Sequence, residues 1–222
     1  MLFSILTNEN YTRLEAIAVF FTGMFIFVAS LMVRRLAQAG SAYIMGDKTP
    51  KETGTFTLNP FKHLDPVGFV CFLLFGIGWS KHVPINPMNF KKYRAGTRLV
   101  SFSGMLSNFL LGLASAITYF ICKDFLPETS FLFIVLDYIM IINGFLVMFN
   151  IIPIFPFDGF TFITSFMRSD NKFIHYSVKN SMKILFTTLI VVLIIEIFTG
   201  FNLLDWFLSL VYGYIYLPIA LI

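Results

Sequence analysis

The sequence predicts an all-α polytopic membrane protein with about five to six transmembrane or re-entrant helices and a small β-like segment at the membrane surface. Hydrophobic residues make up 57% of the 222 positions and charged residues only 13%, whereas soluble domains are about half apolar and about a quarter charged. Several uncharged runs approach the roughly 20 apolar residues that a transmembrane helix needs. The length suits one membrane domain, residues 1–222, without a large soluble module.

The apolar runs give the order of the expected helices. The first span is predicted at 16–33, and its helix can continue to about residue 45 because no proline or turn pair interrupts it. The polar residues 47–66 show some strand alternation and predict a short extended or β-like segment. The uncharged run 66–80 is short for a span and suits a tilted or re-entrant element. Further spans are expected at 99–122, 130–152, 184–204 and 206–222.

The basic residues indicate the topology. They give a formal net charge of +4 and cluster in two loops, 81–98 and 168–183. Two predicted spans separate these loops, so both should lie on one side, which the positive-inside rule makes cytoplasmic. We interpret the clusters as topology signals near anionic headgroups and not as a nucleic-acid surface. No removable signal is evident. From the apolar runs we expect a multi-pass protein that is integral to the cell (inner) membrane.

Asp158 is the most informative single acid. It follows the proline-broken stretch 150-NIIPIFPFDG-159 at the end of a predicted span. Two prolines exclude a regular helix there, so this backbone should face protein or a wet cavity. Asp158 either caps the next helix or serves as a ligand or charge partner inside the membrane domain.

Several ordered motifs together carry a resemblance to a known family. In chain order they are AYIMGDKTPKETGTFTLNPFKHLDPVG, FGIGWSKHVPINPMNFKKYRAG, SGMLSNFLL and NIIPIFPFDG. In this order they resemble the site-2 protease family of intramembrane zinc metalloproteases, in its compact bacterial branch, although Met105 stands where a proline is usual. The resemblance covers about residues 16–167 and leaves 168–222 as C-terminal helices.

The resemblance also indicates what this chain lacks. It implies a helix with the motif HExxH, whose histidines bind zinc and whose glutamate activates water, but this window reads 34-RRLAQ-38. Arg34 and Arg35 replace the first histidine and the glutamate, and Gln38 replaces the second histidine. Arginine has no lone pair for a metal and cannot serve as a base. Only Asp158 remains of the implied ligands, so we expect no intact catalytic residue, no metal and no cofactor.

The two arginines allow two interpretations. We hypothesise that Arg34 or Arg35 supplies the missing positive charge through a bidentate pair with Asp158. The alternative is that both side chains snorkel to the cytoplasmic headgroups at the end of the first span.

Other candidate binding residues lie in the loop after the first span and in a later span: Asn59, Pro60, His63, Asp65 and Asn108. The resemblance places Asn59 and Pro60 near a cleft where they help an extended substrate bind, or they merely fold the loop. His63 with Asp65 should hydrogen-bond the loop into place. Asn108, like Asn143, is a mid-span polar group of the kind that bonds neighbouring helices.

Three functions compete. A catalytically inactive homologue that binds or scaffolds transmembrane segments is favoured by the missing HExxH. An active intramembrane metalloprotease with an atypical site is the alternative. A transport role finds little support, because the sequence has no repeated pair of broken helices. The expected partners are membrane lipids and a transmembrane client protein, with an oligomer left open and nucleic acid excluded.

Overall fold

The computed structural model describes residues 12–75, 78–127, 130–155, 157–167, 171–200, 206 and 209. Within these ranges the chain forms helices joined by turns and irregular segments, and it contains no strand. The predicted all-α class is therefore confirmed for the described part of the chain.

Helix α2, Arg13–Ile44, is the first span and the longest helix described. It begins at a capping box in which the Thr12 side chain accepts from the Glu15 backbone N–H and the Glu15 side chain accepts from that of Thr12. It ends just before Gly46, whose φ of 109° favours glycine. The predicted continuation through the two arginines to about residue 45 is confirmed.

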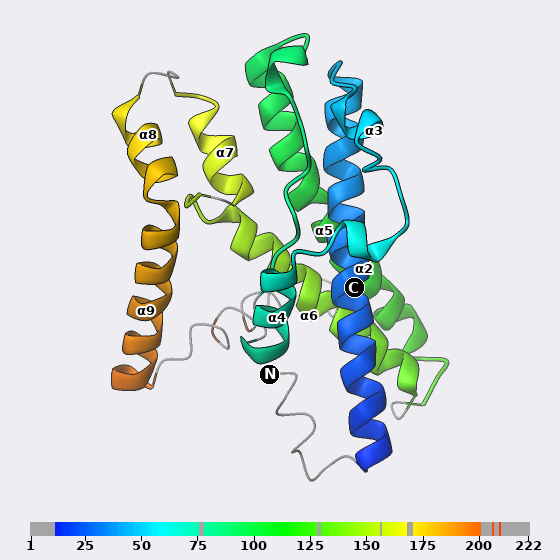
Figure 1. Cartoon of the computed structure of the whole chain (residues 1–222). Helices are drawn as coiled ribbons and strands as arrows, with labels where there is room; N and C mark the ends of the chain where they lie inside the picture. Colours follow the sequence, from blue (N-terminus) through cyan, green and yellow to red (C-terminus); the bar gives the residue numbers. More distant parts are fainter. Residues whose placement is uncertain are drawn as a thin grey trace.

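Helix α5, Tyr93–Cys122, packs against both α2 and α6, Phe131–Ile151 (Figure 1). Among the described helices, α2, α5 and α6 are long and apolar enough to cross a membrane. The count of five to six spans stays a prediction, because most of 206–222 lies outside the described residues. Helix α4, Pro66–Phe75, lies within the run expected to be re-entrant, and its Phe72 ring stacks on Phe27 of α2.

The predicted β-like segment at 47–66 is wrong as a strand. The structure places helix α3, Thr49–Glu52, and the 3-10 turn η1, Pro60–Lys62, in this region. Asn59 caps η1 by accepting from the Phe61 N–H, which turns the chain out of an extended course. The pairing that remains is an isolated antiparallel bridge between Leu64 and Ser80.

A second short turn, η2 at Pro87–Asn89, is tied to the end of α2 by Asp47. The Asp47 carboxylate is fully buried and accepts from the Asn86 N–H and the Asn89 side-chain amide as well as from Thr49. Burial raises the pKa of Asp47, but these hydrogen bonds outweigh burial and hold its pKa below the usual value. An ionised carboxylate thus fixes the loop before α5.

The proline-rich stretch after α6 is irregular, as predicted. Helix α6 ends at Ile151 and α7, Asp158–Thr164, begins seven residues later in the numbering. A Cβ at Gly159 would lie 2.2 Å from the Ile151 carbonyl oxygen, so glycine is needed for this close return. Helices α8, Lys172–Lys179, and α9, Ser181–Thr199, follow and lie beside α7, away from α2 (Figure 1).

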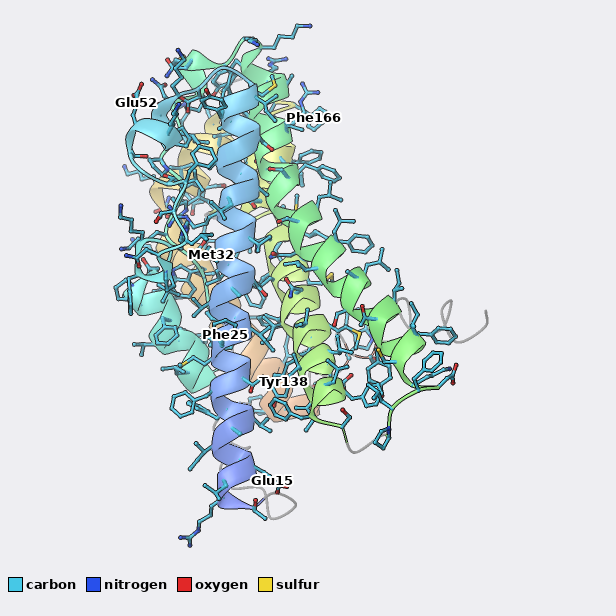
Figure 2. All side chains as sticks on the ribbon, turned by 90° about the vertical axis from the view of Figure 1, so that its right-hand side faces the viewer. Glu15, Phe25, Met32, Glu52, Tyr138 and Phe166 are labelled. Atoms are coloured by element: carbon cyan, nitrogen blue, oxygen red, sulfur yellow. The ribbon has the colours of Figure 1, made fainter. Side chains whose placement is uncertain are left out.

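Two elements that carry basic residues lie at the same end of the molecule. Glu52 and Phe166 lie at one end and Glu15 at the other (Figure 2). The start of α5, with Arg94 and Arg98, and helix α8, with Lys172 and Lys179, lie at the same end as α3 (Figure 1). This arrangement agrees with both basic loops being on one side of a membrane, while the assignment of that side to the cytoplasm stays a prediction.

Candidate functional site

An ion pair links the first span to the start of α7. Arg34 Nη2 lies 2.5 Å from Asp158 Oδ2, and the two side chains are 9% and 15% exposed. Asp158 is the first residue of α7, and the N-cap, Phe157, makes no side-chain capping bond. Asp158 therefore acts as a charge partner. The hypothesis of an arginine–Asp158 contact is confirmed for Arg34.

Two amide side chains complete this polar centre. Gln38 Nε2 donates to the same Asp158 oxygen at 2.8 Å, and Arg34 Nη2 also donates to Asn150 Oδ1. Asn150 in turn donates to the Leu146 carbonyl one helical turn earlier. The predicted bidentate geometry is wrong: one guanidinium nitrogen, Nη2, meets one carboxylate oxygen of Asp158, and the same nitrogen also donates to Asn150.

Arg35 makes different contacts. Its Nη1 donates to the Lys62 carbonyl at 2.8 Å, and its Nη2 donates to the His82 carbonyl at 3.0 Å. The residue is only 4% exposed and Arg34 only 8%, so the snorkelling alternative is wrong for both. Arg35 fastens two loops, one before α4 and one after it, onto the first span.

A glycine allows α5 to approach the polar centre. A Cβ at Gly104 would lie 2.7 Å from Gln38 Nε2 and 3.0 Å from Asp158 Oδ2. Neither Gly104 nor Asn150 was singled out from the sequence. Gly104 stands in the motif SGMLSNFLL and Asn150 in NIIPIFPFDG, both of which carry the family resemblance. Their place in these motifs was the signal from which the sequence could have indicated them.

The mid-span asparagines behave differently from each other. Asn143 of α6 donates to Ser30 Oγ of α2 at 2.9 Å, as expected for a polar group that joins helices. Asn108 of α5 is fully buried, and its side-chain amide has no hydrogen-bond partner among the described residues. The interhelical bond predicted for Asn108 is therefore not found.

The other candidate binding residues organise the loop. His63 is 1% exposed and its Nε2 donates to the Thr57 carbonyl. Asp65 accepts from the Gly68 N–H at the start of α4. His63 and Asp65 therefore bond the loop through separate contacts. Asn59 and Pro60 form the capped start of η1, and the substrate role that the resemblance implies for them stays a prediction.

The charge state of His63 follows from its surroundings. Burial lowers the pKa of this imidazole; the bond to Thr57 opposes that effect in part, and the nearby positive charge of Arg35 lowers the pKa further. The neutral ring is favoured, and it sits beside the backbone that Arg35 holds.

The residues present at Asp158 do not fit zinc. Zinc sites use histidine, cysteine and carboxylate donors, about three of them in catalytic sites. The Asp158 carboxylate instead accepts from the Arg34 guanidinium and the Gln38 carboxamide, and the same guanidinium donates to the Asn150 carboxamide. Among the described residues, no three His, Cys, Asp or Glu side chains are grouped to share a metal ion. His82 and His175 are exposed. The arrangement can bind helices together, but it offers no base beside a metal-bound water.

Comparisons with known proteins give one relative. The chain is similar to a protein of Bacillus subtilis (strain 168) named "Putative zinc metalloprotease YwhC". The two are 37% identical over 141 residues, which cover 61% of this chain and 64% of that protein. The chain thus spans slightly less than two thirds of this relative's length. No family model matches the chain, and no solved structure matches it. The chain therefore has a metalloprotease-like relative.

Proposed function

We propose that this chain is a catalytically inactive homologue of the site-2 proteases, which binds or scaffolds transmembrane segments of other proteins in the cell (inner) membrane. The proposal assigns Arg34, Arg35 and Gln38 to the positions where the resembled family carries HExxH. It is supported by the metalloprotease-like relative and by the three helices, among those described, that are able to cross a membrane.

One observation carries the proposal: the Asp158 carboxylate accepts from both Arg34 and Gln38. A cation fixed to the helix neutralises the acid that a zinc ion would otherwise share. The arginine cannot leave as a metal can, and it has no lone pair to give to one. Hydrolysis would also need a base near the scissile bond, and Arg35 is engaged with two carbonyl oxygens.

A second candidate is an active metalloprotease with an atypical site, which the name of the Bacillus relative favours. The discriminating experiment reconstitutes the purified full chain in vesicles with a single-span test peptide labelled at both ends. We expect no cleavage with added zinc. Zinc-dependent cleavage that disappears in Asp158→Ala would contradict the proposal that the chain is catalytically inactive.

The binding part of the proposal needs its own measurement. Fluorescence transfer between the labelled chain and the labelled single-span peptide is followed as unlabelled chain is added. Specific binding predicts saturable transfer that the unlabelled chain competes away. Transfer that grows only with peptide density in the membrane and resists competition would contradict it.

A further inference from the structure

An apolar groove runs along the side of the helical bundle where α5, α6 and α7 meet. Its volume is about 540 Å³, within the range of about 300–1,000 Å³ typical of small-molecule sites. Its lining is almost entirely apolar: Phe102, Met105, Leu106, Phe109, Val147, Ile151, Gly159, Phe162 and Ile163. Several of these side chains, Phe102 and Ile151 among them, are about half exposed, so the groove opens outward along helices able to cross a membrane.

A positive charge stands at one end of this groove. Arg98 lies one turn before Phe102 on α5, and its guanidinium carbon sits 4.2 Å from the centre of the Phe166 ring. Phe166 contacts Phe162, and Phe162 contacts Phe102, so aromatic rings connect the arginine to the groove. Arg98 Nε is buried without a hydrogen-bond partner, and no carboxylate of the described residues forms an ion pair with Arg98.

The end of the groove that holds Arg98 lies toward the end of the molecule where α3, the start of α5 and helix α8 lie. Phe166 lies near the end that holds Glu52, far from Glu15 (Figure 2). Arg98 comes directly before the uncharged part of α5, where a transmembrane helix meets the headgroup region. The groove would lie at the depth of the hydrocarbon core and Arg98 at the depth of the headgroups. The two features therefore match a molecule with an apolar chain and an anionic head.

We propose that this groove binds an anionic phospholipid, with an acyl chain along α5, α6 and α7 and the phosphate on Arg98. The charge at a single end selects an anionic headgroup, and the groove volume suits an acyl chain better than a helix about 10 Å wide. The site is separate from the Asp158 centre, although Gly159, the neighbour of Asp158, lines the groove. The bound chain therefore rests against the first turn of α7.

The test is native mass spectrometry of the purified full chain in detergent, titrated with phosphatidylglycerol or phosphatidylcholine. We expect one retained phosphatidylglycerol, and a preference over phosphatidylcholine of about fivefold from one basic side chain near the headgroup. Arg98→Gln should remove this preference. The matched control is Lys123→Gln, because Lys123 also lies over a phenylalanine ring, Phe120, but at the opposite end of α5. The control should keep the preference.

A second variant tests the groove itself. Leu106→Trp fills it from a partly exposed position and should reduce retention of phosphatidylglycerol, with unchanged elution in size-exclusion chromatography. Equal losses in Arg98→Gln and Lys123→Gln would overturn the proposal, since binding would then follow overall charge. Full retention in Leu106→Trp would also overturn it, as would a cross-linker at residue 106 that captures a transmembrane peptide instead of lipid.

Discussion

The Arg34–Asp158 pair predicts a large and specific energetic coupling between α2 and α7. Arg34→Met leaves the Asp158 carboxylate with only the Gln38 amide, and Asp158→Asn leaves Arg34 with Asn150. Removing one partner of a buried pair costs about 3–5 kcal/mol, because the other charge stays uncompensated. We expect each single variant to be destabilised on this scale.

The double variant isolates the pair. Two unit charges about 4 Å apart attract by about 4 kcal/mol at an effective dielectric constant of about 20. Both side chains are at most 15% exposed, so solvent screens them little. Since desolvation offsets part of the attraction, we expect a coupling free energy of about 2–3 kcal/mol in the double-mutant cycle.

The assay is reversible unfolding in detergent micelles, followed by circular dichroism during titration with sodium dodecyl sulfate. The control cycle uses Arg35→Met with Asp158→Asn, because Arg35 neighbours Arg34 but bonds to Lys62 and His82. That cycle should couple by less than about 0.5 kcal/mol. Equal coupling in the two cycles, or less than about 1 kcal/mol for Arg34, would refute the assigned contact.

Three further predictions test the surroundings of this pair. Gly104→Ala places a Cβ 2.7 Å from Gln38 Nε2 and should lower the free energy of unfolding by about 1–3 kcal/mol. The control is Gly112→Ala, whose Cβ lies 3.7 Å from Asn143 and which should lower the free energy of unfolding by less. Equal effects of the two variants would contradict the close approach of α5. Arg35→Gln should speed amide exchange in the loops 57–64 and 80–86 but not in α6, and unchanged loops would contradict the fastening role. Because the pKa of His63 is lowered in the folded state, the unfolded state binds more protons, and the free energy of unfolding should fall as the pH drops below about 6.5. His63→Gln should lose this part of the pH dependence. An identical pH profile in the variant would contradict the lowered pKa.

The sequence predicted the helical architecture because its signals are local. The extent of α2 follows from an apolar run without breakers, and the irregular stretch before Asp158 follows from its prolines. The β-like segment failed because the alternation in 47–66 competes with turn residues, and Asn59 directs the chain into a 3-10 turn instead. Short alternating patterns are weak where no neighbouring strand exists to pair with.

The candidate site was predictable in its residues but less so in its geometry. Arg34 and Gln38 are four residues apart and share a helix face, so both can reach Asp158. Arg35 is rotated by about 100° and faces the loops. Helical spacing could have chosen between the arginines. The approach of Gly104 and the lack of a partner for Asn108 depend on how α5 packs against α2, which one sequence does not determine.

The zinc content of the purified full chain tests the central claim most directly, that Arg34 takes the place of a metal at Asp158. After dialysis against zinc, the zinc bound per chain is measured by elemental mass spectrometry. The same measurement is made on the triple variant Arg34→His, Arg35→Glu, Gln38→His, which restores two histidines near Asp158. We predict no stoichiometric zinc in the unsubstituted chain and about one zinc ion per chain in the restored variant. One tightly bound zinc ion in the unsubstituted chain, lost on Asp158→Ala, would contradict the account.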